Sequence, residues 1–288
     1  MKRIAPWIEA MRLRTLPVSV AGVVLAIGYA RHFGCAELLP AMLCLAFAIL
    51  AQIASNFANE YYDFRAGLDK AGREGPRRGV TEGDITPRAM LAATFITLGA
   101  ACAVGCSLLL FGPWWLLPAG IAIALGVLAY STGPYPLSRH GLGEVAVMLF
   151  FGIVPVNLTF YIMNGAFNHE VLLGSLSAGF MGANVLLVNN YRDVDDDRSV
   201  GKHTLTVMIG RRATWTLYLT SGILAVLLMA GIWATLPPAT WAIPAIYLLL
   251  HLRLCYMLCT RTGRRLNPLL GLTAIAMAAY CVAFACVA

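Results

Sequence analysis

Long, uninterrupted stretches of apolar residues recur along the whole chain, and short polar segments separate them. Nine such stretches cover residues 15–33, 39–62, 89–112, 114–131, 143–163, 170–191, 213–234, 239–258 and 268–287. Their length, about 20 residues, is what an α-helix needs to cross a lipid bilayer. They are solidly apolar rather than alternating, which predicts helices and not the strands of a barrel. The pattern therefore predicts an all-α, polytopic membrane protein with nine transmembrane helices and one domain, residues 1–288.

The composition agrees with a membrane protein and excludes a soluble globular one. Hydrophobic residues make up 59% of the chain and charged residues 12%, whereas about 25% of an ordinary soluble domain is charged. The 8 cysteines form no C-x-x-C pair, so we expect neither disulfides nor a zinc site. P-loop, G-x-S-x-G, H-E-x-x-H and G-x-G-x-x-G motifs are absent from the sequence, which therefore gives no support to nucleotide hydrolysis, serine hydrolysis or zinc proteolysis.

The distribution of basic residues predicts how the chain is oriented. If the nine stretches cross the membrane in alternation, every one of the 21 Lys and Arg residues except Arg31 falls on the side of the N-terminus. Because Lys and Arg concentrate in the cytoplasmic loops of membrane proteins, this asymmetry predicts a cytoplasmic N-terminus. It also accounts for the net charge of +7 without a nucleic-acid partner.

Two clusters of asparagine and acidic residues lie at the ends of two predicted helices, on the side predicted to be cytoplasmic. The first cluster contains Asn56, Asn59, Glu60 and Asp63, followed by Asp69, and the second contains Asn189, Asn190, Arg192, Asp193 and Asp197. Within each cluster, steps of three or four residues place the oxygen-bearing side chains on one helix face. Ionisable groups beside hydrocarbon are costly and usually mark a functional site.

A basic, glycine-containing segment follows each cluster, near residues 63–88 and 192–212, so that the whole arrangement resembles a repeat. The two segments supply the candidate phosphate ligands Arg77, Arg78, Arg198 and Lys202. Mg²⁺ prefers hard oxygen ligands and is commonly held by a few carboxylates together with substrate phosphates. We therefore interpret the two clusters as halves of one magnesium–diphosphate site. The alternative, solvated loop charges paired with neighbouring arginines, applies best to Asp195 and Asp196.

The two clusters resemble the paired motifs of the UbiA superfamily of intramembrane prenyltransferases. The first motif of that family is similar to N-x-x-N-D-Y-x-D-x-x-x-G-x-D, matched here by Asn56, Asn59, Tyr61, Asp63, Gly67 and Asp69. The second is similar to N-N-x-R-D-x-x-x-D-R-x-x-G-K-x-T-L, matched by Asn189, Asn190, Arg192, Asp193, Asp197, Arg198, Gly201, Lys202, Thr204 and Leu205. The segments Arg14-Thr15-Leu16-Pro17, Gly75-Pro76-Arg77-Arg78-Gly79 and Gly141-Leu142-Gly143-Glu144 are also similar. Glu60 departs from the pattern, because the family usually has Asp there.

The resemblance implies a nine-helix bundle around a central cavity that opens to lipid for an isoprenoid tail. It implies Mg²⁺ as cofactor, with the candidate metal ligands Asn59, Glu60, Asp63, Asp69, Asp193 and Asp197. It further implies that the diphosphate is bound by Asn56, Arg77, Arg78, Asn190, Arg192, Arg198 and Lys202. Catalytic roles are expected for Asp63, Asp193 and Lys202. The candidates for holding the aromatic acceptor are Arg14, Tyr130, Tyr135, Asn189 and Tyr191, although the Tyr130–Leu137 segment is first of all a Pro/Gly turn.

Within the superfamily, the likeness is greatest to the 1,4-dihydroxy-2-naphthoate polyprenyltransferases of menaquinone biosynthesis. This implies Mg²⁺-dependent transfer of a polyprenyl chain from its allylic diphosphate to that naphthoate, with loss of CO₂ and diphosphate, to give a demethylmenaquinol. It also implies a bacterial inner-membrane protein whose active site faces the cytoplasm. Other acceptors stay open at this stage: 4-hydroxybenzoate, homogentisate, haem or glycerophosphate. A secondary transporter is the alternative from another class, but its polar groups are expected near the bilayer midplane rather than at helix ends.

Overall fold

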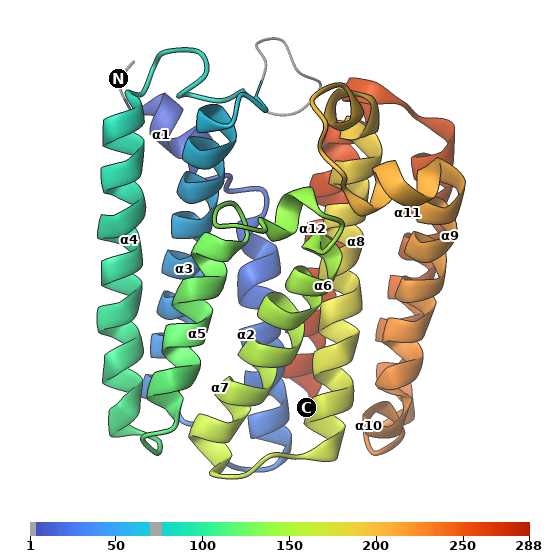
Figure 1. Ribbon diagram of the computed structural model, residues 1–288. Helices are drawn as coiled ribbons and strands as arrows, with labels where there is room; N and C mark the ends of the chain where they lie inside the picture. The colour runs from blue at the N-terminus through green and yellow to red at the C-terminus, as the bar shows by residue number, and fades with distance from the viewer. Residues whose placement is uncertain (1–3, 70–76) are drawn as a thin grey trace.

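Helices run side by side through the computed structural model, which describes residues 4–69 and 77–288 (Figure 1). The α-helices are α1 (Ala5–Ala10), α2 (Leu16–His32), α3 (Leu38–Arg65), α4 (Pro87–Ser107), α5 (Leu116–Ala129), α6 (Gly143–Val147), α7 (Val154–Asn164), α8 (His169–Ser199), α9 (Leu205–Leu228), α10 (Ala230–Ala234), α11 (Ala242–Thr260) and α12 (Asn267–Val287). The described residues contain no β-strand. The all-α prediction is therefore confirmed.

One helix, or two or three consecutive helices, covers each of the nine predicted stretches. In the described part of the chain, six helical segments are long and apolar enough to cross a membrane: Leu38–Arg65, Pro87–Leu110, Gly143–Asn164, His169–Ser199, Pro238–Thr260 and Gly263–Val287. The apolar helices α2 and α5 are shorter, at 17 and 14 residues. The number of crossings, nine, thus stays a prediction.

The predicted connection at 192–212 is wrong for most of its length, because helix continues through the second cluster. α8 extends to Ser199, and Gly201 then adopts a positive φ of 71°, so that the Lys202 N–H bonds the Asp197 carbonyl at 2.9 Å. Such a left-handed glycine is a common way to end a helix. α9 begins soon afterwards and is interrupted at Gly210, where φ is 79° and ψ is 166°. The second cluster is consequently held on a rigid helix.

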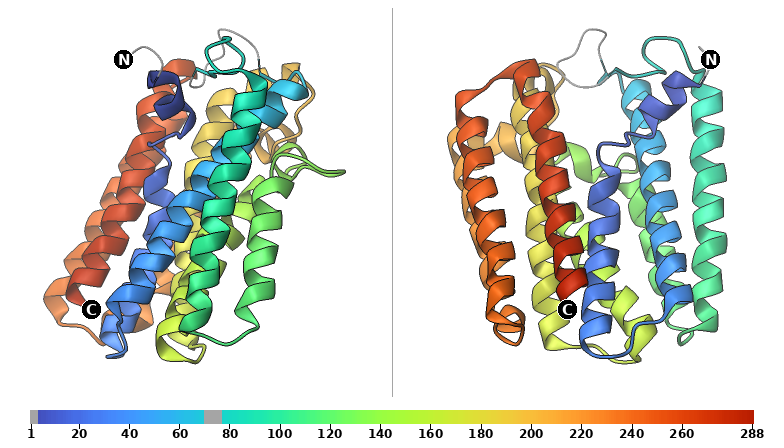
Figure 2. Two further views of the ribbon diagram at one scale, coloured as in Figure 1. Left: turned by 90° about the vertical axis from the view of Figure 1, so that its left-hand side faces the viewer. Right: turned by 180° about the vertical axis from the view of Figure 1, so that it is seen from behind.

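α2 and α8 occupy the interior of the bundle. α2 packs against α12, α7, α3 and α8, and Figure 2 shows α2 beside α12 in the view from behind. A Cβ atom added to Gly28 of α2 would lie 2.9 Å from the Ala285 Cα atom of α12, closer than side chains allow. Small residues permit this backbone approach, which is a common packing device between membrane helices.

α6 and α7 form one continuous helical segment, Gly143–Asn164, which we call the rod. It contains a π-helix at Met148–Ile153. Pro155, in the first turn of α7, has no N–H to donate, and π-turns commonly occur where the regular ladder of hydrogen bonds is disturbed. Gly152 lies within this turn and faces α8: an added Cβ would come within 2.5 Å of the Ser175 carbonyl oxygen. The rod and α8 are therefore in backbone contact.

Large apolar side chains cover the outward faces of the peripheral helices. Examples include Ile96 on α4, Leu125 on α5, and Ile246 and Leu249 on α11, all more than half exposed. Soluble proteins rarely expose apolar surface on this scale, whereas lipid solvates it. Together with the six long apolar segments, this surface indicates an integral membrane protein.

The connections after α3, between α5 and α6, and after α8 gather at one end of the bundle, beside the N-terminal helix α1 (Figure 1). We call this the polar end, defined by Asp63 on α3 and Asp197 on α8. The C-terminus lies toward the opposite end. Gly75 and Pro76 of the Gly-Pro-Arg-Arg-Gly segment lie outside the described residues.

Candidate active site

The first cluster is buried on one face of α3, where Asn59 is its most connected member. Its side-chain nitrogen donates to Asp63 Oδ2 at 3.1 Å and to Ser131 Oγ at 3.2 Å. Its oxygen accepts hydrogen bonds from Arg12 at 2.6 Å and from Arg78 at 3.3 Å. One amide therefore joins α3 to three other segments of the chain, and its own orientation is fixed by them.

Asp63 is a carboxylate of the first cluster with several partners. Arg139 Nη2 lies 3.2 Å from its Oδ1 atom, and Lys202 Nζ lies 3.8 Å from its Oδ2 atom. The Arg139 guanidinium also donates to the Tyr62 and Ser131 carbonyls. Because its side chain is 2% exposed, Asp63 depends on these cations to offset the cost of burying its charge.

The second cluster is organised by Arg192 of α8. Its Nε and Nη2 atoms bind both oxygens of Asp193, at 2.6 and 2.7 Å. The same guanidinium donates to Asn189 at 2.8 Å and to Asn267 at 3.0 Å. A forked, bidentate pair of this kind fixes both side chains in one geometry. Arg192 thereby links α8 to the start of α12.

The two clusters meet at Lys202. Its ammonium group lies 3.8 Å from Asp63 on α3 and 3.7 Å from Asp197 on α8. The Gly201 turn at the end of α8 brings Lys202 back toward Asp197, as the hydrogen bond from its N–H to the Asp197 carbonyl shows. Two carboxylates that are far apart in the sequence thus share one cation at the polar end.

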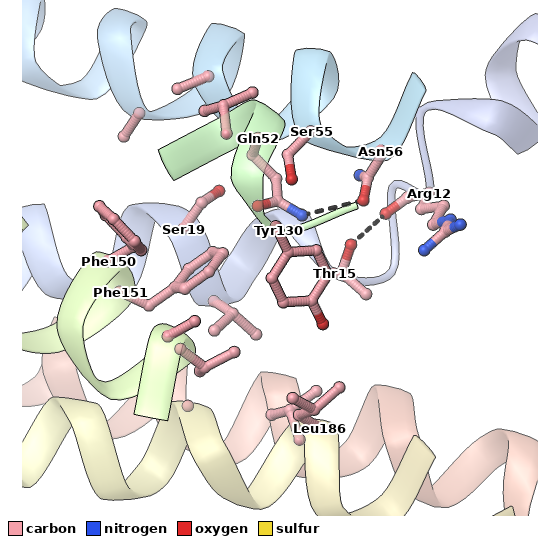
Figure 3. A pocket seen from close by; sticks show the side chains of 18 of the residues that line it. Arg12, Thr15, Ser19, Gln52, Ser55, Asn56, Tyr130, Phe150, Phe151 and Leu186 are labelled. Carbon is pink, nitrogen blue, oxygen red and sulfur yellow. Dashed lines mark hydrogen bonds between the residues drawn. The ribbon is translucent and has the colours of Figure 1, made fainter. Parts of the chain in front are cut away.

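A cavity of about 630 Å³ extends from this polar end into the bundle. Polar side chains line the part of the cavity nearest the polar end, including Arg12, Asn59, Arg78, Arg192 and Lys202. Apolar side chains line the rest, including Phe47, Leu108, Ile123, Phe150, Leu158 and Ile162. Figure 3 shows Tyr130, Gln52, Ser55 and Asn56 around the cavity together with Phe150 and Phe151. One continuous space therefore has a cationic head and an apolar body.

Most of the predicted ligands of diphosphate and acceptor border this cavity: Arg14, Asn56, Arg77, Arg78, Tyr130, Asn189, Asn190, Arg192 and Lys202, together with the predicted metal ligand Asn59. Three other predicted ligands lie elsewhere. Arg198 is 60% exposed and pairs with Asp195. Tyr135 is exposed and stacks on His140, and the Tyr191 ring faces Arg211. The structure does not bring these three side chains to the cavity.

The predicted metal ligands fall into two groups. Asp63, Asp193 and Asp197 lie behind Lys202 and Arg192, the paired cations that line the cavity. Glu60 and Asp69 instead hold the segment that follows the first cluster. Glu60 accepts a hydrogen bond from the Val80 N–H at 3.0 Å, and Asp69 pairs with Arg78 at 3.3 Å.

The residues at Lys202 fit Mg²⁺ in the chemistry of their donors. Asp63 and Asp197 already hold one positive charge between them. The neighbouring Asn59 donates to Asp63 through its amide nitrogen, while its oxygen accepts from Arg12 and Arg78. No group of three or more His, Cys, Asp or Glu side chains is close enough to hold a metal within residues 4–69 and 77–288. Mg²⁺ sites of few carboxylates are completed by substrate phosphates, so this donor set is that of a site formed jointly with a phosphorylated substrate.

Two residues that contact the first cluster were not predicted from the sequence. Arg12 precedes the first apolar stretch, has a positive φ of 51° and reaches Asn59. Arg139 lies in the connection before α6 and binds Asp63. A single arginine in a loop is not part of a periodic pattern, so the sequence does not show what it contacts. The nearest sequence signals were neighbouring motifs: Arg14-Thr15-Leu16-Pro17 for Arg12 and the Tyr130–Leu137 turn for Arg139.

The model of the UbiA prenyltransferase family matches residues 15–266, which is most of the chain. The chain belongs to this family. A 1,4-dihydroxy-2-naphthoate octaprenyltransferase of Mycobacterium leprae is 34% identical over 293 residues, covering 99% of this chain and 96% of the relative. The enzyme of the same name from Escherichia coli is 35% identical over 217 residues, covering 73% of this chain and 70% of the relative.

Solved structures of the UbiA family share the fold. A UbiA homolog from Archaeoglobus fulgidus bound to DMAPP and Mg²⁺ superposes with a TM-score of 0.69, at 15% identity, over 98% of this chain and 99% of that one. An apo UbiA homolog from Aeropyrum pernix K1 has a TM-score of 0.69 at 20% identity, over 93% and 95% of the two chains. The family match and the relatives named as naphthoate prenyltransferases together show that this UbiA protein is an aromatic prenyltransferase.

Proposed function

We propose that this UbiA enzyme transfers a polyprenyl chain from an allylic polyprenyl diphosphate to 1,4-dihydroxy-2-naphthoate. Diphosphate and CO₂ leave, and a demethylmenaquinol forms. The observation that carries this proposal is a continuous cavity with a cationic head and an apolar body, which matches the two parts of a prenyl diphosphate. The choice of acceptor is supported by relatives whose names specify that naphthoate, one of them 34% identical over 99% of the chain.

The diphosphate is proposed to lie at the polar end, among Arg12, Arg77, Arg78 and Lys202, with Arg192 at the α8 wall. Mg²⁺ would be held by Asn59, Asp63, Asp193 and Asp197. The choice of metal is supported by UbiA homologs solved with Mg²⁺ together with DMAPP or GPP. When bound, Mg²⁺ supplies Lewis-acid stabilisation of negative charge on the phosphate oxygens. Metal binding by Glu60 and Asp69 also stays a prediction, and would require both carboxylates to leave their present partners.

The reaction begins with cleavage of the bond between the allylic carbon and the diphosphate oxygen. Negative charge grows on the departing diphosphate, and the cations that line the polar end are preorganised to stabilise it. Positive charge grows on the allylic carbon, which lies at the boundary between the polar and the apolar walls. Tyr130 and Phe150 border this region and can face the allylic cation with their rings.

The acceptor is proposed to enter the same boundary region, where Arg14, Tyr130 and Asn189 border the cavity. Arg14 can bind the carboxylate of an aromatic acid, because guanidinium and carboxylate groups match in geometry. The electron-rich ring then attacks the allylic carbon, and the carboxylate is replaced by the prenyl chain. The apolar body of the cavity excludes water, which would otherwise capture the allylic cation.

We further propose nine membrane crossings with the N-terminus and the polar end in the cytoplasm of a bacterial inner membrane. The N-terminal helix α1 lies at the polar end and the C-terminus lies toward the other end (Figure 1), which agrees with an odd number of crossings. The concentration of Lys and Arg at the polar side supports this orientation.

The experiment that tests the function supplies the purified protein with Mg²⁺, a long-chain allylic diphosphate and one of several aromatic acids. We expect prenylated product and CO₂ with 1,4-dihydroxy-2-naphthoate, and little product with 4-hydroxybenzoate or homogentisate. Preference for another acceptor would refute the naphthoate assignment but would leave the proposal of prenyl transfer intact. Movement of substrate across sealed vesicles without consumption of diphosphate would refute both.

A further inference from the structure

Glu144 is a buried carboxylate at the start of α6 that lines the cavity, and its side-chain partner among the described residues is the uncharged Asn190. It is 5% exposed, and Asn190 Nδ2 donates to its Oε1 atom at 2.8 Å. Its Oε2 atom is fully buried and, among the described residues, accepts no hydrogen bond. No salt bridge reaches Glu144 from any residue in 4–69 or 77–288. An unpaired buried carboxylate oxygen is costly, and a hydrogen-bond donor supplied by a ligand would remove that cost.

The surroundings of Glu144 place it at the boundary between the two parts of the cavity. Tyr130 borders it from the end of α5, because an added Cβ on the neighbouring Gly143 would lie 3.7 Å from the Tyr130 hydroxyl. Asn190 belongs to the polar wall on α8, whereas Ala146 and Phe150, which follow on the same rod, belong to the apolar wall. An aromatic ring that meets the allylic carbon at this boundary therefore comes within reach of Glu144.

The other carboxylates of the site are poorly suited to accept a proton. Asp63 pairs with Arg139 and Lys202, Asp193 binds Arg192 through both oxygens, and Asp197 pairs with Lys202. A neighbouring positive charge stabilises the ionised form of a carboxylate and weakens it as a base. Among the described residues, the acids that line the cavity itself are Glu9, at its exposed rim, and Glu144.

We propose that Glu144 is a catalytic residue that accepts the proton of the acceptor hydroxyl adjacent to the carbon that attacks. This inference rests on the proposed function, which supplies an acceptor with that hydroxyl. As the new carbon–carbon bond forms and the bond to diphosphate breaks, the hydroxyl proton moves to Glu144 and the hydroxyl carbon becomes a ketone. The product of this step is a β-keto carboxylate.

The second half of the reaction restores both the ring and the base. The carboxylate is β to the new ketone, so the carbon–carbon bond to CO₂ breaks and its electron pair forms the enolate of the aromatic ring. Glu144 returns its proton to that oxygen. One carbon–oxygen bond and one carbon–carbon bond break, one carbon–carbon bond forms, and the protein ends in the state in which it began. No oxidant or additional reactant is needed.

The direct test replaces Glu144 by Gln, which keeps the size of the side chain and an oxygen that can accept from Asn190 but cannot take up a proton. General-base catalysis typically contributes about 10²- to 10⁴-fold. We therefore expect the Glu144→Gln variant to lose about a hundredfold or more in kcat, with the KM for the prenyl diphosphate nearly unchanged. The matched control is Glu170→Gln at the far end of α8, whose Oε2 is likewise buried and, among the described residues, without a hydrogen bond; it should keep its activity.

A pH profile separates proton acceptance from a structural role. At high pH the acceptor hydroxyl ionises by itself, so the rate of the Glu144→Gln variant should rise with the ionised fraction of that hydroxyl, while the wild-type rate rises much less. The titratable side chain that faces Glu144 from α5 is Tyr130, and Asn190 on α8 is neutral. Thermal unfolding of both variants in detergent checks that they are folded.

Either of two outcomes would overturn the assignment: a Glu144→Gln variant with normal kcat, or a loss of kcat that is the same at every pH. Both outcomes leave the proposed function intact, because the wild-type enzyme still prenylates the naphthoate. Absence of naphthoate prenylation by the wild-type enzyme would instead refute the proposed function itself.

Discussion

At the scale of single residues, the site is an arrangement of opposite charges in which every buried carboxylate of the two clusters has a basic or amide partner. Asp63 illustrates this, because Arg139, Lys202 and Asn59 all reach it. Such groups are costly to bury alone, and removal of one partner typically costs more than the pair contributes. The same pairing keeps the polar end folded when no substrate is bound.

Replacement of Asp63 by Asn tests the metal–diphosphate interpretation. The variant keeps the shape of the side chain but loses one of the two charges around Lys202. Loss of one preorganised electrostatic contact costs about 10²- to 10³-fold in kcat in other enzymes. We expect a loss of at least that size, measured as product formed per minute by purified enzyme.

The control for Asp63 is Asp195→Asn. The Asp195 side chain is 70% exposed and pairs with Arg211 and Arg198 on the outside of the bundle. Exposed pairs contribute about 0–1 kcal/mol, so activity should stay near that of the wild type. Equal activity of the Asp63 and Asp195 variants would contradict the site.

At the scale of elements, the position of the second cluster depends on the contact between α8 and the rod that contains the π-helix. Gly152 allows this contact, since an added Cβ would come within 2.5 Å of the Gly179 Cα atom and of the Ser175 carbonyl oxygen, both in α8. These are backbone atoms, which cannot move aside without shifting the helix. Residues of both elements line the cavity, so a shift of α8 away from the rod would alter the cavity wall.

Gly152→Ala should therefore lower stability and activity together. Overpacking of this kind typically costs about 1–3 kcal/mol, which we expect to appear as a lower midpoint of thermal unfolding in detergent. The matched control is Gly99→Ala on α4, where an added Cβ has no neighbour within 4 Å and alanine favours helix. A Gly152→Ala variant as stable as Gly99→Ala would show that α8 adapts without cost.

At the scale of the whole molecule, the cavity runs from the polar end to residues near the opposite end, such as Leu116 and Ile162. Its depth is set by the way α4, α5 and α7 close around it. A prenyl chain that follows the apolar walls would reach these residues only if it is long. The far end of the cavity should consequently select for chain length.

Ile162→Trp fills that far end. We expect transfer from a long-chain prenyl diphosphate to fall by about tenfold or more, the effect of 1.4 kcal/mol, while transfer from geranyl diphosphate is retained. Competition between the two donors in one assay, read by mass spectrometry, measures the change. Ile121→Trp on the exposed face of α5 is the control and should leave the donor preference unaltered. If neither variant changes the donor preference, the prenyl chain does not occupy this end of the cavity.

Removal of divalent cations tests how the whole site is assembled. Lys202 already neutralises part of the charge of Asp63 and Asp197, so the protein should remain folded in EDTA. Activity should disappear and return when Mg²⁺ is added. Stabilisation against thermal unfolding should require Mg²⁺ and a prenyl diphosphate together. A site with so few acidic ligands binds a metal ion only weakly when phosphate is absent. Unfolding in EDTA alone would contradict this account.

The pattern of apolar stretches was sufficient to predict an all-helical membrane protein and the approximate helix positions, since lipid requires each spanning segment to satisfy its own backbone. The helical spacing of Asn56, Asn59 and Asp63 also predicted a common face, because local geometry alone decides it. The extent of α8 was predicted less well. Its polar last turns have no hydrophobic signal, and in the structure they are helical, with their acids paired to Arg192 and Lys202.

Sequence by itself determined the local features of this protein: which segments are apolar, which helix faces bear oxygen ligands, and which family motifs occur. The tertiary structure alone decided which side chains meet. It joined Asp63 to Asp197 through Lys202, brought Arg12 and Arg139 to the first cluster, and kept Tyr135, Tyr191 and Arg198 away from the cavity. The physical reason is that these contacts depend on helix packing and on single backbone turns, such as the one at Gly201, whose effect on distant residues has no local pattern.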